Sequence, residues 1–351
     1  QKEIQNNGIP VTSVESLTRS NEIMNGRVKT LHPKIFGGIL ADKNNPSHLK
    51  DLNSIDGFPF DVVIANLYPF EEEAIKKKIN IDKAIEFIDV GGPSMLRAAA
   101  KNFNSVIVLS NPNQYAQFID EYDKNDGIIN LELRKQFSIE VFKLTYKYDQ
   151  MIFRYLSFDD NILPNNLTID LELDDRLRYG ENPHQKSAFY LEDNDKHIWT
   201  KHQGKQLSYD NYADIESAYK IVEEFTDNAC CIIKHSNPCG FSLDKDPVKS
   251  YKKAIESDPV SYFGGIVGFN FEVDIDLAKE LNKSFLECII APSFSEDALK
   301  TFKEKKNLRV LTMNGNNKND FLSLKSVAGG YLIQEKDYLI VSQSAILILI
   351  R

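Results

Sequence analysis

The 351-residue chain has few cysteines, a single tryptophan and no long hydrophobic run. Its four cysteines, Cys230, Cys231, Cys239 and Cys288, all lie in the second half, and two of them are adjacent within an apolar segment. This layout does not suit a disulfide framework. No apolar run approaches the ~20 residues that cross a bilayer, and the first residues show no signal-peptide core. These absences predict a reduced, cytoplasmic protein without a membrane partner.

The chain is also short of positive charge, since its formal net charge is −9. A general nucleic-acid partner would need a basic surface, so the charge argues against that class. A small anionic ligand stays compatible, because a few local lysines and helix N-termini can bind a phosphate. The sequence contains no Walker loop, no G-x-G-x-x-G and no G-x-S-x-G.

We expect no metal site. Pro238-Cys239 begins the second half of a zinc-deaminase signature, but Ser242 stands where the next cysteine would be, and no His-x-Glu occurs. His235 and Cys239 alone would supply two ligands, too few for tetrahedral zinc. We therefore interpret Cys239 as a packing residue.

Strand-like runs alternate with helical patterns along the chain, which predicts α/β layering. The length favours two domains, and the polar segment 159–168 is the candidate linker. We expect domains at 1–160 and 161–351. Expected helices cover 71–78, 95–101, 129–148, 214–225, 247–257 and 275–284. Expected strands cover 61–67, 106–109, 229–233, 265–269 and 288–291.

The apolar run 229–233 ends in Lys234 and His235, and a Pro-Gly turn follows. An unbroken apolar run of this length predicts a strand buried on both faces. In open α/β sheets the C-terminal ends of strands border the ligand crevice, so this pair would put a cation beside a group that titrates near neutral pH. The alternative is a strand that surfaces into solvent with two ordinary polar residues.

In the first half, Gly91 and Gly92 precede the helical run 95–101, and Asp89 lies just before them. Backbone N–H groups in such a turn can approach an anion closely, and the helix dipole favours the negative charge. The alternative is an ordinary helix start. The basic cluster 27–34 either binds phosphate or forms a surface loop.

Three segments of the second half combine polar and small residues. Segment 178–185 holds a planar cation, an aromatic ring and a histidine, a combination that suits phosphate recognition and stacking. Segment 204–212 is a polar loop before the helix expected at 214–225. Segment 261–265 places glycines where a backbone can lie against a ligand.

Seven motifs occur along the chain in this order: GRVKTLHPKI, ANLYPF, IDVGGPSMLRAAAKN, LRYGENPHQ, GKQLSYDNYADIESAY, IKHSNPCG and SYFGGIVGF. Together they closely resemble the family of bifunctional purine biosynthesis proteins, in which AICAR formyltransferase is joined to IMP cyclohydrolase. The resemblance implies a methylglyoxal-synthase-like parallel-sheet domain, followed by a cytidine-deaminase-like α/β transformylase domain without zinc.

The resemblance also implies the last two steps of de novo purine (IMP) biosynthesis. The second-half site would transfer a formyl group from the cosubstrate 10-formyltetrahydrofolate to the 5-amine of AICAR. The first-half site would close formyl-AICAR to IMP with loss of water. A homodimer is implied as well, with formyl-transfer sites built across the subunit interface.

For formyl transfer, the amine of AICAR is a poor nucleophile because its lone pair is delocalised, so a base near neutral pKa must remove its proton. The family pattern assigns this role to His235, with Lys234 as the cation that stabilises the oxyanion or protonates the leaving nitrogen. It implies that the nucleotide is held by Arg178, Tyr179, His184, Asn211, Gly264 and Glu287.

Ring closure needs oxyanion stabilisation and proton shuttling rather than an enzyme nucleophile. By resemblance, the catalytic residues are Lys29, Tyr68, Asp89 and Lys101. The nucleotide would contact Arg27, Thr30, Asn66 and Val90, the last through its backbone.

Two departures from the family pattern concern the chain ends. The upstream strand and phosphate-binding loop are expected to be missing, and the family continues well beyond residue 351. A truncated, non-catalytic module that binds purine nucleotides and a cyclohydrolase-only enzyme therefore stay as alternatives.

Overall fold

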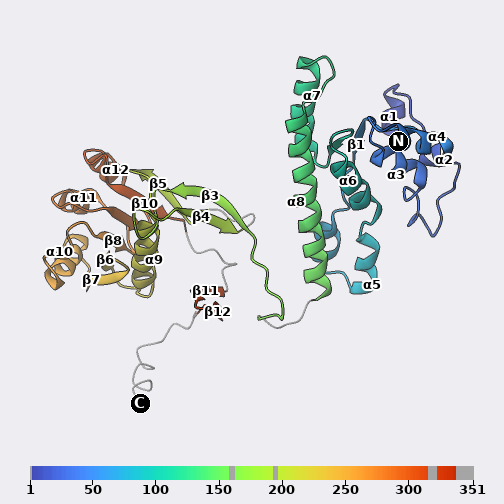
Figure 1. Cartoon of the computed structure of the whole chain (residues 1–351). Helices are drawn as coiled ribbons and strands as arrows, with labels where there is room; N and C mark the ends of the chain where they lie inside the picture. The colour runs from blue at the N-terminus through green and yellow to red at the C-terminus, as the bar shows by residue number, and fades with distance from the viewer. Residues whose placement is uncertain (1, 158–162, 193–196, 315–321, 337–351) are drawn as a thin grey trace. The chain divides into compact units, whose positions relative to one another are not determined.

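The computed structural model describes residues 2–157, 163–192, 197–314 and 322–336 (Figure 1). The chain divides into two compact units, Gln1–Asn161 and Ile162–Arg351. The expected domain boundary and the first part of the expected linker, 159–162, lie outside the described residues. Within the described residues, no helix combines the length and apolar character needed to span a membrane.

The first unit is built on a parallel pair of short strands, β1 (Val62–Ile64) and β2 (Ile107–Leu109). Helix α6 (Gly91–Lys101) belongs to the connection between them, as a parallel pair requires a crossover. Helices α3 (Pro33–Leu40) and α8 (Leu131–Leu156) contact α6 and share one apolar core with it.

The remaining elements of this unit are short. They are α1 (Lys2–Asn6), α2 (Val14–Thr18), α4 (Pro46–Ser54), η1 (Glu71–Ile75), α5 (Ile81–Ala84), η2 (Ile85–Phe87), η3 (Pro112–Gln114) and α7 (Tyr115–Lys124). The helix expected at 71–78 is a π-helical turn that stops at Ile75. Three lysines follow, with no apolar residue to extend the buried face, and Lys78 has φ 48°.

The second unit contains a six-stranded sheet in the order β5-β10-β9-β8-β6-β7 (Figure 1). Its strands are β5 (Trp199–Gln203), β6 (Ala229–Lys234), β7 (Asn237–Leu243), β8 (Ile266–Phe269), β9 (Cys288–Ala291) and β10 (Arg309–Met313). Strands β8, β9 and β10 are parallel, whereas β6 is antiparallel to both neighbours and β5 is antiparallel to β10.

Helices cover both faces of this sheet. Helix α9 (Tyr209–Glu223) lies on one face; α10 (Pro247–Ser257), α11 (Ile275–Leu281) and α12 (Glu296–Phe302) lie on the other. Successive residues of β6 alternate between them: Cys231 packs on the α9 side and Ile232 on the α10 side, both fully buried. The sequence predicted this two-sided burial from the unbroken apolar run.

Two antiparallel pairs complete the unit: β3 (Leu171–Leu177) with β4 (Ser187–Glu192), and β11 (Leu322–Val327) with β12 (Gly330–Glu335). Helix α9 begins earlier than expected, at Tyr209, because Ser208 and Asn211 form a capping box at its start. Helix α8 extends beyond the expected end at residue 148, and Asn130 caps its N-terminus.

Candidate active sites

In the second unit, the sheet register brings several expected site residues to one edge. Ile233 of β6 lies opposite Ile266 of β8, which lies opposite Cys288 of β9, and Cys288 is paired with Arg309 of β10. Residues next to these positions therefore gather there: Lys234 is the last residue of β6, Gly264 lies two residues before β8, and Glu287 directly precedes β9. This edge is where the parallel strands begin. Lys234 ends its strand as expected, but because β6 runs antiparallel to β8, it lies at the opposite edge from the C-terminal ends of β8, β9 and β10.

Lys234 and His235 stand at the tip of the β6–β7 hairpin. Lys234 pairs with Asn237, so His235 and Ser236 form a two-residue loop, with φ values of 53° and 58°. The half-buried Lys234 donates from Nζ to the carbonyl oxygen of Phe263 at 3.0 Å, while His235 is exposed. The lysine is thus fixed against the neighbouring loop and the imidazole faces solvent.

The loop before β8, which contains Phe263, is itself held by hydrogen bonds to Asp258 and Phe285. Asp258 Oδ1 accepts from the backbone N–H groups of Val260 and Ser261, at 3.1 and 2.8 Å. A hydrogen bond with the Ser261 side chain, together with these backbone hydrogen bonds, lowers the pKa of the Asp258 carboxyl, and the charge of Lys234 lowers it further. Gly264, at φ 75°, donates its N–H to the carbonyl oxygen of Phe285 at 2.8 Å, a backbone conformation that suits glycine.

Glu287 is held by an arginine that sequence reasoning missed. Arg309 is 4% exposed, and its Nη1 lies 2.5 Å from Glu287 Oε2. Its Nε and Nη2 donate to the carbonyl oxygen of Gln206 at 3.1 and 3.0 Å. Gln206 Nε2 in turn donates to the Asp175 carboxylate at 3.0 and 3.1 Å. This chain of contacts links β3 to the edge.

The segment 178–185 follows β3. The guanidinium of Arg178 lies over the Tyr179 ring, 5.2 Å from its centroid, and both Arg178 and His184 are exposed. Asn211, in contrast, is buried, and its Oδ1 accepts from the backbone N–H of Ser208 at 3.1 Å. Asn211 thus caps the N-terminus of α9, whereas the sequence predicted that it would contact the nucleotide.

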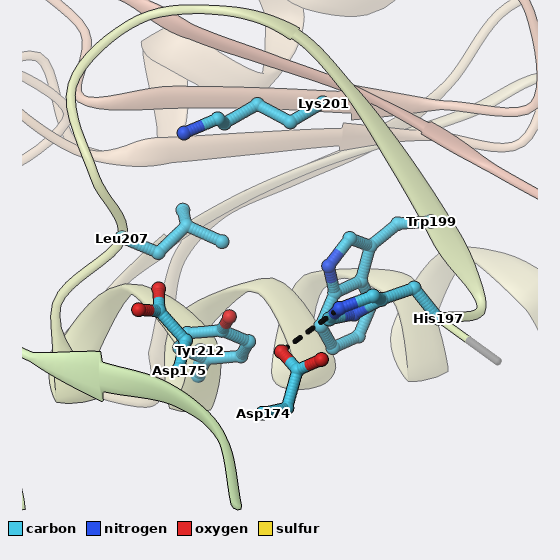
Figure 2. Close-up of a pocket in the computed structure, with 7 residues that line it drawn as sticks. All are labelled: Asp174, Asp175, His197, Trp199, Lys201, Leu207 and Tyr212. Carbon is cyan, nitrogen blue, oxygen red and sulfur yellow. Dashed lines mark ion pairs between the residues drawn. The ribbon is translucent and has the colours of Figure 1, made fainter. Parts of the chain in front are cut away.

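A cavity of about 270 Å³ lies beside this network, lined by Asp174, Asp175, His197, Trp199, Lys201, Leu207 and Tyr212 (Figure 2). His197 Nε2 lies 2.9 Å from Asp174 Oδ2. The Tyr212 ring stacks on Phe189 with centroids 4.4 Å apart, and burial, with Asp175 and Asp174 nearby, raises the pKa of Tyr212 to about 12. His197 and Trp199 were not predicted as site residues from the sequence.

In the first unit, Asp89 is fixed at the start of α6. Its Oδ1 accepts from the Gly92 N–H at 2.8 Å, and its own N–H donates to the Tyr148 hydroxyl at 2.8 Å. Gly91 and Gly92 are the first residues of the helix rather than a turn before it, so the expected helix start at 95 is corrected. A Cβ atom at residue 92 would collide with Asp89 Oδ2, so this close approach requires glycine.

The basic cluster lies against the same helix start. A Cβ atom at Gly91 would lie 3.1 Å from Thr30 Oγ1. Lys29 Nζ lies 2.9 Å from Glu15 Oε1 and 3.1 Å from Glu22 Oε2, and its hydrogen bonds to these carboxylates raise the pKa of Lys29.

Arg27, the charged residue of the expected nucleotide set, pairs with Glu86. The three carboxylates around the cluster, at 15, 22 and 86, were not identified from the sequence. Arg27 and Lys29 are therefore paired with acidic residues rather than left as free cations.

Lys101 does not join the other expected ring-closure residues within one chain. It ends α6, an 11-residue helix, so its Cα lies about 15 Å from the Asp89 end at ~1.5 Å of rise per residue. The contacts of Asn102 agree, because its side chain donates to the carbonyl oxygens of Ile39 and Ala41 at the far end of α3.

Asn66 and Tyr68 lie just after the C-terminal end of β1. The connection between the parallel strands β1 and β2 places the N-terminus of α6 at this same edge. Tyr68 and Val90 are exposed by 61% and 58%. Seven of the eight expected first-half residues thus lie at the α6 start, belong to the basic cluster packed on it, or follow β1 toward that edge: Arg27, Lys29, Thr30, Asp89, Val90, Asn66 and Tyr68.

No group of three His, Cys, Asp or Glu side chains in the described ranges could hold a metal ion. All four cysteines are free thiols. Cys239 Sγ lies 3.5 Å from the carbonyl oxygen of Ile232, and burial raises the pKa of its thiol. This environment is that of a packing residue, as the sequence suggested.

Comparison with known proteins gives consistent matches over nearly the whole chain. The model of the MGS-like domain matches residues 1–94, and that of the AICARFT/IMPCHase bienzyme matches residues 99–349. The protein named bifunctional purine biosynthesis protein PurH from Caldicellulosiruptor bescii is 45% identical over 97% of this chain and 68% of its own length.

Proteins of the same name from Caldicellulosiruptor saccharolyticus and Clostridium acetobutylicum are each 44% identical over 96% of the chain. The chain spans about two thirds of the length of these relatives, 67% in both. A solved structure titled "Crystal structure of ForH" aligns with 44% of this chain and 80% of its own, at 29% identity and a TM-score of 0.37.

Proposed function

The chain belongs to the AICARFT/IMPCHase bienzyme family, and on this premise we propose that it catalyses the last two steps of purine biosynthesis. These are formyl transfer to AICAR and dehydrative closure of formyl-AICAR to IMP. The observation that carries the proposal is the 45% identity over 97% of the chain, together with the gathering of Lys234, Gly264 and Glu287 at one sheet edge.

For formyl transfer, we propose 10-formyltetrahydrofolate as the donor. The AICAR amine attacks the formyl carbon while His235 accepts the amine proton, and the bond from that carbon to the folate nitrogen breaks as the nitrogen takes up a proton. Lys234 stabilises the negative charge that develops on the formyl oxygen. Its hydrogen bond to Phe263 supports this role, because a cation already fixed in place needs little reorganisation.

The nucleotide would be held around this edge. Glu287 suits a hydrogen bond to the carboxamide-bearing base, since Arg309 fixes one of its oxygens. Arg178 and His184 are exposed and free to reach a phosphate, and Tyr179 lies under the Arg178 guanidinium. Gly264 allows the backbone to lie close to the ligand.

For ring closure, the carboxamide nitrogen attacks the formyl carbon and water leaves. We propose that Lys29 stabilises the oxyanion as a cation, since Glu15 and Glu22 favour its protonated form. Asp89, held rigidly by Gly92 and Tyr148, would take up the nitrogen's proton, and Tyr68 would donate a hydrogen bond.

We also propose a homodimer. The support is the length of α6, which separates Lys101 from Asp89 within one chain. A second copy would supply Lys101 to the ring-closure site.

Product analysis tests the two reactions. Purified protein is mixed with AICAR and 10-formyltetrahydrofolate, and separately with formyl-AICAR alone; IMP is expected from both. IMP formed in the assay with formyl-AICAR but not in the assay with AICAR and 10-formyltetrahydrofolate would identify a cyclohydrolase-only enzyme. AICAR binding without turnover in either assay would identify a non-catalytic module.

A further inference from the structure

The hairpin that carries His235 has an unusual sequence for its shape. A two-residue loop between antiparallel strands favours positive φ at both positions, which Asn-Gly adopts readily and branched or larger residues do not. Here the loop residues are His235 and Ser236, at φ 53° and 58°. The local sequence therefore opposes the observed conformation, so a contact from elsewhere must hold it.

That contact comes from Asp214 on α9. Asp214 is buried, at 8% exposure, and its Oδ1 accepts the backbone N–H of Ser236 at 2.6 Å. The Ser236 hydroxyl lies 3.4 Å from the same oxygen. A second, local contact runs from Asn237 Nδ2 to the His235 carbonyl oxygen at 2.8 Å. Of these two partners of the loop, Asn237 belongs to the hairpin itself, and Asp214 belongs to a separate element, helix α9.

The position of Asp214 makes it a rigid support. The residue lies one turn into α9, whose start is fixed by the Ser208–Asn211 capping box. The next residue, Ile215, is buried by the sheet and anchors the helix. A carboxylate oxygen is a strong acceptor for a backbone N–H, stronger than a neutral one.

We propose that Asp214 is a positioning residue for formyl transfer: by holding the Ser236 N–H, it keeps the loop in the left-handed conformation that aims His235 at the substrate amine. The proposal rests on the proposed formyl transfer. Asp214 touches neither substrate nor reacting atoms in this assignment, so it acts through His235.

The test compares Asp214→Ala and Asp214→Asn with the matched control Glu216→Gln on the same helix, where Glu216 pairs with Lys220. We expect Asp214→Ala to lower kcat for formyl transfer about tenfold or more, with ring closure of formyl-AICAR unchanged. Asn keeps an acceptor oxygen, so Asp214→Asn should retain kcat within about threefold. The control should match the unmodified protein.

A second substitution separates positioning from general support of the fold. Glycine adopts φ near 58° without strain, so Ser236→Gly in the Asp214→Ala background should recover most of the lost kcat. A merely structural role of Asp214 would not respond to this change. Wild-type kcat in Asp214→Ala, or a loss restored by neither Asn nor Gly, overturns the proposal.

Hydrogen exchange of the Ser236 amide gives a readout that does not depend on activity. The amide should be protected in the unmodified protein and exchange faster in Asp214→Ala. If the unmodified protein transfers no formyl group, the proposed function fails, and the exchange data still report whether Asp214 holds the loop. Equal exchange in both proteins overturns the positioning role on its own.

Discussion

Arg309 and Glu287 form an ion pair in which the arginine side chain is 5% exposed and the glutamate side chain 39% exposed. The buried partner is satisfied by this carboxylate and by the carbonyl oxygen of Gln206. Because a buried guanidinium without a counter-charge is costly, the glutamate is needed for stability as well as for its place at the sheet edge.

Glu287→Gln should therefore have two effects. It leaves the buried Arg309 charge without its counter-ion, although the amide oxygen can still accept a hydrogen bond, and we expect a loss of about 1–2 kcal/mol in the free energy of unfolding. The KM for AICAR should rise more than kcat falls. Chemical denaturation and steady-state kinetics measure the two effects, with exposed Glu304→Gln as the control. An unchanged denaturation midpoint would contradict the stability argument.

His235→Ala should abolish formyl transfer while ring closure of added formyl-AICAR continues near the unmodified rate. The imidazole is the proposed base, and the two sets of motifs lie in separate compact units, so loss of one reaction should spare the other. Lys234→Ala should behave in the same way. The two reactions are followed by separating AICAR, formyl-AICAR and IMP. Formyl transfer at the unmodified rate in His235→Ala would remove histidine from the mechanism.

The acidic partners of Lys29 should set the upper pH limit of ring closure. Glu15 and Glu22 raise the pKa of Lys29 in the folded protein above its value in the unfolded chain. The stability that these ion pairs give is therefore fully present below the unfolded-state pKa of Lys29. It is lost, together with the ammonium charge, as pH rises through the folded-state pKa. Replacing both by Gln should lower this pKa and move the basic limb of the rate profile to lower pH.

Rates of ring closure between about pH 8 and 11 check this prediction, since the ordinary lysine pKa is ~10.4. Lys29→Ala serves as the reference, in which IMP formation should be blocked and formyl-AICAR should accumulate after correction for the spontaneous rate. A basic limb that does not move in the double variant would show that Lys29 does not titrate in the reaction.

The sequence predicted the buried strand at 229–233 and the helix at 247–257 well, because unbroken apolar runs and Pro-started amphipathic runs are local signals. It could not predict that β6 is antiparallel to β8, since strand direction depends on pairing between distant segments. For the same reason it missed Asp214 and Arg309. Each lies in an ordinary helix or strand pattern and becomes informative only through its contacts with Ser236 and Glu287.

The separation of Lys101 from Asp89 leads to a prediction about mixed dimers. If a second copy supplies Lys101, then Asp89→Ala and Lys101→Ala homodimers should each lose ring closure, because each lacks one member of every site. Mixed dimers carry one site with both residues intact. When the two variants are unfolded together and refolded, random pairing makes half of the dimers mixed. Each mixed dimer has one intact site of two, so about a quarter of the unmodified ring-closure activity should return.

The controls fix the interpretation. Each variant refolded alone should stay inactive, and formyl transfer should persist in both, which shows that the chains fold. If the mixture stays as inactive as its components, Lys101 does not act across a subunit interface. Because α6 places Lys101 about 15 Å from the helix start beside Asp89 in one chain, Lys101 would then have to be removed from the ring-closure site.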